Sequence, residues 1–93
     1  MADIELTVMH PVGLHARPAA AFVRMASSFP CEIKIRNLTA ESPLVNAKSI
    51  LSVLTLGVNQ GHRVVVEANG EKAAEALEAL QALIQSNFGE NQA

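Results

Sequence analysis

The sequence predicts an α+β fold, an open-faced sandwich in which a four-stranded antiparallel sheet carries three helices on one face. Four short segments alternate apolar and polar residues, as strands buried on one side do, and they span residues 4–9, 31–36, 44–47 and 63–68. Three other segments place apolar residues at helical spacing, and they span residues 16–28, 48–57 and 71–87. Because each helix must bury its apolar stripe, we expect all three on the covered face of the sheet.

A short break separates the first strand from the first helix. Ile4, Leu6 and Val8 alternate with other residues until the Pro-Val-Gly run at 11–13 interrupts the pattern. The helix that follows starts near residue 16, and Pro18 suits its first turn, where a missing N–H costs nothing. Its apolar stripe consists of Ala19, Phe22, Val23 and Ala26.

The middle of the chain is expected to hold a hairpin and a short helix. The polar turn at 37–43 joins the second and third strands, which we expect to pair. The short helix has Ser49 near its start and ends at Gly57, a residue type favoured just after a helix. Apolar residues at helical spacing, of which one or more should enter the core, are Ile50, Leu51 and Leu54.

The last helix is expected from Glu71 to about residue 87, with the Glu71 carboxylate near the positive end of the helix dipole. Its buried stripe is predicted to comprise Ala76, Leu77, Leu80 and Ile84. Residues 88–93 are expected to form a frayed tail. No repeat or linker divides the sequence, so residues 1–93 are expected to form a single domain.

Composition argues against several classes of function. The net charge is −2, no basic run is present, and tryptophan and tyrosine are absent, so nucleic-acid binding is not expected. No apolar stretch approaches the ~20 residues of a membrane helix. The single cysteine, Cys31, cannot form an internal disulfide and suits a reducing cytoplasm, where we expect the protein. Cys31 is interpreted as a small buried apolar residue, not as a nucleophile.

The spacing of the three histidines does not indicate a metal site. His10, His15 and His62 match no known ligand pattern and lie on different elements. We therefore expect no metal and no cofactor, and we interpret His10 and His62 as solvated or core histidines.

His15 lies in the run GLHARPAA at residues 13–20, just before or within the first turn of a predicted helix. The free N–H groups of a helix N-terminus favour an anion. Arg17 adds a guanidinium whose donors match phosphate oxygens, and a neutral imidazole is a good nucleophile. This combination suits phosphoryl transfer to His15, with Arg17 and the amides of Ala16 and Arg17 holding the phosphoryl oxygens. The alternative is that His15 simply caps the helix or lies in a solvated loop.

The run GLHARPAA, together with KSILSVLTLG at residues 48–57, resembles the histidine-containing phosphocarrier (HPr) family of the sugar phosphotransferase system, over nearly the whole chain. The resemblance implies that His15 accepts a phosphoryl group on Nδ1 from enzyme I and passes it to enzyme IIA domains, with Arg17 assisting. It implies that Ser49 matches a serine that an ATP-dependent kinase phosphorylates in many members. It also implies the strand order 1-4-2-3. We expect a monomer that acts as a carrier without independent turnover.

The resemblance also implies a docking surface beside His15. The exposed face of the short helix is a hydrophobic patch in the family, and Leu51 and Leu54 are our candidates to project outward. Arg24 lies seven residues after Arg17 and is expected on the same side of its helix. The residues assigned to this partner surface are Ala20, Arg24, Ile50, Leu51 and Leu54. The alternative for Arg24 is an ordinary solvated helix face.

One departure from the family pattern bears on function. Val12 stands where the family commonly has a polar residue that bonds the phosphoryl group, so the phosphorylated form is expected to be held less well. This observation keeps a second hypothesis open, in which the chain is a regulatory binding module controlled by phosphorylation, with no role in sugar transport. A serine kinase/phosphorylase and a transcriptional regulator are then further candidate partners.

Overall fold

The computed structural model describes residues 2–89, which form the predicted series of strand, helix, strand, strand, helix, strand and helix. The elements are β1 (Ala2–Thr7), α1 (Ala16–Ser27), β2 (Glu32–Asn37), β3 (Val45–Asn46), α2 (Ile50–Leu54), β4 (Arg63–Asn69), α3 (Ala73–Gln85) and a 3-10 turn, η1 (Asn87–Gly89). Within residues 2–89, no helix is both long enough and apolar enough to cross a membrane.

The four strands form one antiparallel sheet in the order β1-β4-β2-β3, which confirms the expected order. The central strand β4 pairs with β1 on one side and β2 on the other, so that Val66 lies opposite both Ile4 and Ile35. Alternate residues of β2 and β4 are buried, and those between them face the open side. The alternating pattern in the sequence therefore reports the covered and open faces correctly.

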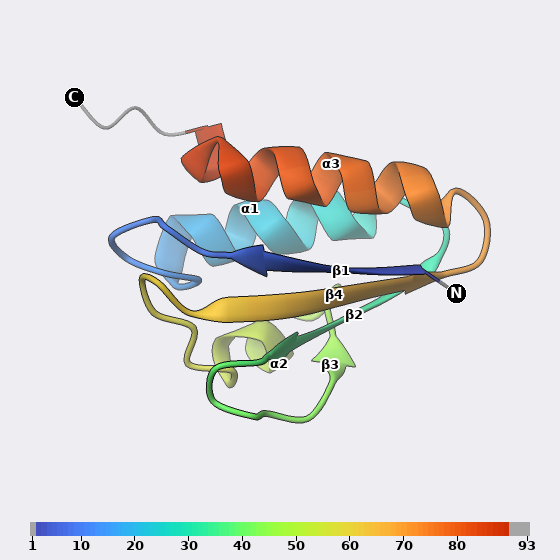
Figure 1. Cartoon of the computed structure of the whole chain (residues 1–93). Coiled ribbons are helices and arrows are strands. Elements are labelled where there is room, and N and C mark those ends of the chain that lie inside the picture. The colour runs from blue at the N-terminus through green and yellow to red at the C-terminus, as the bar shows by residue number, and fades with distance from the viewer. Residues whose placement is uncertain (1, 90–93) are drawn as a thin grey trace.

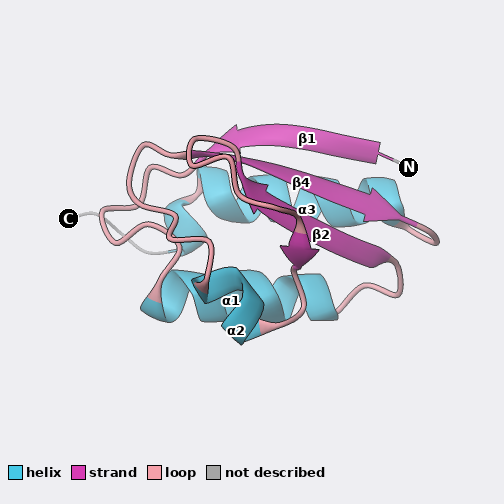
Figure 2. Ribbon diagram, turned by 90° about the horizontal axis from the view of Figure 1, so that it is seen from below, coloured by secondary structure: helices cyan, strands magenta, loops and turns pink. Residues whose placement is uncertain are grey.

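The helices cover one face of this sheet, as the open-faced sandwich requires. Helices α1 and α3 lie side by side over the strands (Figure 1), and α2 packs against α1 near β3 (Figure 2). All four residues of the apolar stripe predicted for α3 are buried. Of the four residues in the stripe predicted for α1, Val23 alone is partly exposed. The largest side chains sealed between helices and sheet are Phe22, Leu14, Ile33, Ile35, Leu80 and Ile84.

The C-terminal end of α3 differs from the sequence prediction. Phe88, assigned to a frayed tail, is only 7% exposed, and its ring meets the ring of His10 edge-on at a centroid distance of 5.9 Å. The prediction was wrong at Phe88 because a tail residue that packs on a distant loop has no local pattern. Gly89, also in the expected tail, ends the 3-10 turn η1, and residues 90–93 lie outside the described residues.

Helix α3 begins two residues later than expected. Lys72 is its N-cap, with a left-handed backbone (φ +64°), so Glu71 precedes the helix. The acidic side chain in the first turn is that of Glu75, and it takes the place that we assigned to Glu71 beside the helix dipole.

Leu51 and Leu54 project outward from helix α2 as expected, but the expectation that one of the three apolar residues at helical spacing enters the core was wrong. Ile50, Leu51 and Leu54 all remain exposed, and Leu51 is 75% exposed. The buried residue of the helix is Val53, followed by Leu56 just after it. Apolar residues run almost around this five-residue helix, so the sequence left its phase open, and the packing position of Val53 decides it.

Candidate functional site

Two loops meet beside the N-terminus of α1. The segment at residues 8–15 follows β1, and the segment at residues 55–62 connects α2 to β4; both lie at the left of Figure 1. Three backbone hydrogen bonds join them. Val8 N–H donates to the His62 carbonyl at 2.9 Å, Gly61 N–H to the Val8 carbonyl at 2.7 Å, and Leu14 N–H to the Val58 carbonyl at 2.9 Å. The loop that leads to His15 is therefore anchored to the second loop at both of its ends, at Val8 and at Leu14.

Gly13 makes this close approach possible. Its φ is +72°, a region that side chains rarely adopt, and a Cβ atom there would lie 2.3 Å from the Val58 carbonyl oxygen. A glycine is thus required twice over, by the backbone conformation and by the neighbouring chain.

His15 is the N-cap residue of α1, with an extended backbone and a half-buried side chain. Its side chain makes no capping hydrogen bond, so neither ring nitrogen is engaged by the backbone of the helix. The ring instead places Nε2 3.3 Å from the Asn59 side-chain oxygen Oδ1. Ala16, the next residue, has a φ of +50°, which turns the chain into the helix through a strained left-handed conformation.

The first turn of α1 gathers the groups that could hold an anion. Ala16 and Arg17 are its first two residues, and their N–H groups belong to the set that has no partner within a helix. The Arg17 side chain is exposed and has no ion-pair partner among residues 2–89, so its guanidinium is not engaged by a carboxylate of this part of the chain. An imidazole, free amides and a guanidinium thus share one helix end, an arrangement suited to a transferable phosphoryl group.

The predicted docking residues lie on exposed parts of α1 and α2. A groove of about 430 Å³ runs between these helices and is lined by Ala20, Val23, Arg24, Ser27 and Ile50. Leu51 and Leu54 project from α2, and Val12 is 47% exposed on the loop before His15. We call the groove, together with the exposed Leu51 and Leu54 of α2, the α1–α2 surface; it is largely apolar, and Arg24 is its charged residue.

Ser49 lies at the N-cap of α2, in agreement with the sequence analysis. Its Oγ accepts a hydrogen bond from the backbone N–H of Ser52 at 3.3 Å. The half-buried hydroxyl is next to Ile50, so a modification there would alter the α1–α2 surface directly.

The other residues considered as candidates, two histidines and the cysteine, contribute to the packing and hydrogen bonding of the fold. His10 is buried, and its Nδ1 accepts a hydrogen bond from Val12 N–H at 3.1 Å. Cys31 is a buried free thiol in the core. His62 is half-buried and hydrogen-bonded. Among residues 2–89, no group of three His, Cys, Asp or Glu side chains is placed to hold a metal ion.

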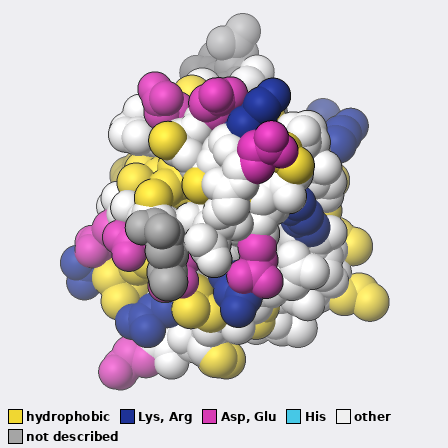
Figure 3. Space-filling model, turned by 90° about the vertical axis from the view of Figure 1, so that its right-hand side faces the viewer, with side chains coloured by type: hydrophobic (Ala, Val, Ile, Leu, Met, Phe, Trp, Pro, Cys, Tyr) yellow, Lys and Arg dark blue, Asp and Glu magenta, His cyan; other side chains and the backbone are white. Residues whose placement is uncertain are grey.

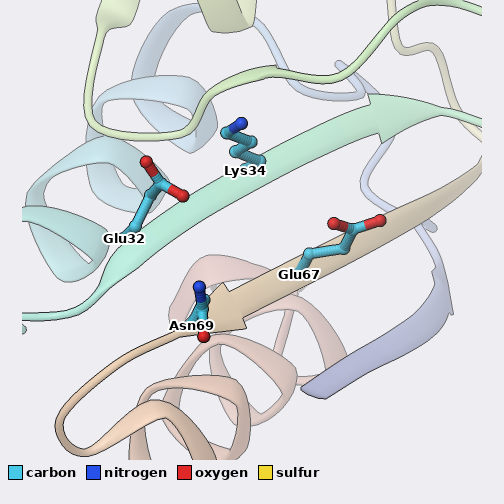
Figure 4. Close-up of a pocket in the computed structure, with 4 residues that line it drawn as sticks. All are labelled: Glu32, Lys34, Glu67 and Asn69. Atoms are coloured by element: carbon cyan, nitrogen blue, oxygen red, sulfur yellow. The ribbon is translucent and has the colours of Figure 1, made fainter. Parts of the chain in front are cut away.

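A small hollow of about 80 Å³ on the open face of the sheet offers no second phosphoryl site. It is lined by Glu32, Lys34, Glu67 and Asn69 (Figure 4). Two carboxylates flank the single amine, and they would repel a phosphate. The end of the molecule where β4 finishes also shows acidic and basic side chains interspersed (Figure 3), so no field of one sign gathers there.

Asn59 was not singled out by the sequence analysis. The signal available was the run Asn-Gln-Gly at 59–61, which indicates a turn. Nothing local indicates that this turn lies against a histidine 44 residues earlier in the chain.

Known proteins resemble the chain along nearly all of its length. The family model described as "PTS HPr component phosphorylation site", for the phosphotransferase system (PTS), matches residues 2–86. The phosphocarrier protein HPr of Pseudomonas putida is 39% identical over 88 residues, which cover 95% of this chain and 96% of that protein. A crystal structure of HPr-C-His from Thermoanaerobacter tengcongensis superimposes with a TM-score of 0.92 at 43% identity, covering 98% of this chain and 99% of that one.

A longer relative contains the same domain. The multiphosphoryl transfer protein of Haemophilus influenzae is 45% identical over 85 residues, which are 91% of this chain but 17% of that protein. The fold, the strand order and the matches over whole HPr proteins agree with one another. The chain therefore belongs to the HPr family and has the phosphocarrier role of that family in the PTS.

Proposed function

We propose that His15 is the residue that carries the phosphoryl group, taking it on Nδ1 from enzyme I and passing it to an enzyme IIA domain. The observation that carries this proposal is the position of His15 at the N-cap of α1, with a side chain that makes no capping bond, beside the exposed Arg17. HPr relatives that match along the whole chain favour this role over a regulatory module without transport.

The transfer needs only groups that the helix end supplies. The Nδ1 lone pair forms a bond to phosphorus while the bond between phosphorus and the donor breaks, and its electron pair leaves with the donor. The Nε2 proton stays on the ring, so no general base is required. Arg17 and the amides of Ala16 and Arg17 stabilise the charge on the phosphoryl oxygens, which is how phosphoryl transfer is usually catalysed. Val12 adds no hydrogen bond from its side chain, and the phosphorylated form is held by the remaining donors.

The α1–α2 surface is the proposed docking site for both partners. Its exposed Leu51 and Leu54 can bury apolar area against a partner, and Arg24 can meet an acidic edge. One surface next to His15 suits short contacts with a donor and then an acceptor. A serine kinase/phosphorylase acting on Ser49 and a transcriptional regulator are further proposed partners, and they rest on the family resemblance. We place this relay in the cytoplasm, since the buried thiol of Cys31 suits a reducing compartment.

The decisive experiment incubates the protein with enzyme I and phosphoenolpyruvate and measures the intact mass. Wild type should gain one acid-labile phosphoryl group, and His15→Ala should gain none. Ser49→Ala is the matched control and should gain the same acid-labile group as wild type. A phosphoryl group on His15→Ala, or none on wild type, contradicts the assignment.

A further inference from the structure

We propose that Asn59, held in place by His62, is a positioning residue that keeps the proton of the neutral His15 ring on Nε2 and leaves Nδ1 free to attack phosphorus. The inference rests on the proposed function of His15 as the acceptor. It adds a residue from the loop between α2 and β4 to a site otherwise built at the start of α1.

The contact between the two side chains determines which ring nitrogen carries the proton. Asn59 Oδ1 lies 3.3 Å from His15 Nε2, and a carbonyl oxygen can only accept. Nε2 must therefore donate, and a neutral imidazole has only one proton to place. The lone pair is then on Nδ1, the atom that the proposed transfer uses.

Asn59 does not rely on its own side chain to stay in position. Residues 59–62 form a tight turn in which His62 N–H donates to the Asn59 carbonyl at 3.0 Å, and Gly61 takes the positive φ (+87°) favoured at the third position of such a turn. Asn59 N–H in turn donates to the His62 side-chain atom Nδ1 at 3.1 Å. His62 thus hydrogen-bonds both polar main-chain groups of Asn59: its backbone N–H bonds the Asn59 carbonyl, and its ring bonds the Asn59 N–H.

His62 is itself anchored to the core through a buried amide. Asn37, at the end of β2, is fully buried, and its Nδ2 donates to the Leu56 carbonyl at 3.0 Å and lies 3.2 Å from His62 Nδ1. Its Oδ1 accepts from Ala40 N–H at 3.1 Å. Because His62 Nδ1 accepts N–H groups, its own proton lies on Nε2. A chain of hydrogen bonds therefore connects the sheet to the His15 ring through His62 and Asn59.

The same bond should help the reaction as well as the tautomer. As Nδ1 forms its bond to phosphorus, the ring gains positive charge and Nε2–H becomes a stronger donor. The hydrogen bond to Asn59 is then stronger in the transition state than in the free protein, which is the condition for accelerating a step. For one neutral, solvent-exposed hydrogen bond, we expect a contribution of about two- to tenfold in rate.

The first test observes the His15 ring directly in the unphosphorylated protein. Two-bond ¹H–¹⁵N correlation spectra at about pH 8.5, where an imidazole is ordinarily neutral, distinguish a protonated from an unprotonated ring nitrogen. We expect wild type to show Nε2 protonated and Asn59→Ala to show an increased share of protonated Nδ1. Asn59→Asp keeps an acceptor oxygen and should keep the wild-type pattern.

Gln60→Ala is the matched control for this test. Gln60 is the neighbouring amide, and its Nε2 donates to the Met9 carbonyl and not to His15. It should leave the ring unchanged. If Gln60→Ala changes the protonation of the His15 ring as Asn59→Ala does, the cause is a general loosening of the loop. If the His15 ring in Asn59→Ala is protonated as in wild type, the hydrogen bond to Asn59 does not determine the tautomer. Either result overturns the inference.

The second test asks whether His62 acts through Asn59. His62→Ala should shift the His15 ring as Asn59→Ala does, and His62→Asn, which restores an acceptor, should reverse the shift. Single-turnover transfer from phosphorylated enzyme I should slow about two- to tenfold in each alanine variant and no further in the double variant, because both changes remove one interaction. Multiplied effects, or an unshifted ring in His62→Ala, would refute the holding role. Failure of wild type to accept phosphate would contradict the proposed function alone, since the spectra are read without phosphorylation.

Discussion

Replacing Gly13 by alanine adds one methyl group at the point where the two loops of the site meet. The added Cβ atom would lie 2.3 Å from the Val58 carbonyl oxygen and 2.7 Å from the Asn59 Cα atom, so one of the two loops has to move. Those loops carry His15 and Asn59. The substitution therefore tests both the packing of the site and the reason for a glycine in the run Gly-Leu-His.

The expected loss of stability has two parts. An alanine at φ +72° costs about 1–2 kcal/mol in backbone strain, and forcing an atom into filled space costs about 1–3 kcal/mol more. Alanine also restricts the unfolded chain, which returns about 0.4–1 kcal/mol. The net expectation is a loss of about 1–4.6 kcal/mol in the free energy of unfolding.

Gly57→Ala separates the two parts. Gly57 also has a positive φ (+60°), but nothing lies within 4 Å of the Cβ that would be added. It should incur the backbone strain alone, and after the effect on the unfolded chain the loss should lie between about 0 and 1.6 kcal/mol. The matched pair thus isolates the contact with Val58.

Urea denaturation of wild type and both variants measures these losses as shifts of the midpoint at constant slope. Gly13→Ala should unfold at a clearly lower urea concentration than Gly57→Ala, and its His15 should accept phosphate more slowly because the loop is displaced. Equal midpoints for the two variants would refute the argument that the loops are in contact at Gly13.

Three further predictions concern the site, its regulation and the end of the chain. Arg17→Ala should slow single-turnover phosphorylation of His15 by roughly 30- to 1000-fold with an unchanged melting curve, since its side chain is exposed; unchanged kinetics would exclude a catalytic role. Ser49→Asp should keep or raise the melting temperature while weakening enzyme I binding at least several-fold, about 1 kcal/mol or more, because it sets an unpaired charge beside an apolar docking surface; wild-type affinity in calorimetry would contradict this. Phe88→Ala should lose about 3 kcal/mol of unfolding free energy by urea titration, and a loss under about 0.5 kcal/mol would show that Phe88 does not seal the core.

Local patterns in the sequence determined the elements of this protein and their buried faces. Alternation in β2 and β4 reports which residues face the helices, because successive side chains of a strand point to opposite sides. The stripe of α3 from Ala76 to Ile84 likewise follows from its period alone. Where apolar residues ran nearly around a short helix, as in α2, no period could select Val53, and packing against α1 and β3 made the choice.

The chemistry proposed for His15 could also be inferred from the sequence, since the histidine, the arginine and the start of the helix are neighbours in the chain. The strand order came from the family resemblance, because periodicity does not indicate which strands are adjacent.

Only the tertiary structure decided what surrounds the His15 ring. Asn59 reaches Nε2 because the loops at 8–15 and 55–62 are joined by backbone hydrogen bonds and meet at a glycine without a Cβ. Phe88 is buried because it packs on His10, a residue from the other end of the chain. Contacts between distant segments depend on the paths of whole elements, and those paths follow from how the sheet and helices pack together, which no local residue pattern encodes.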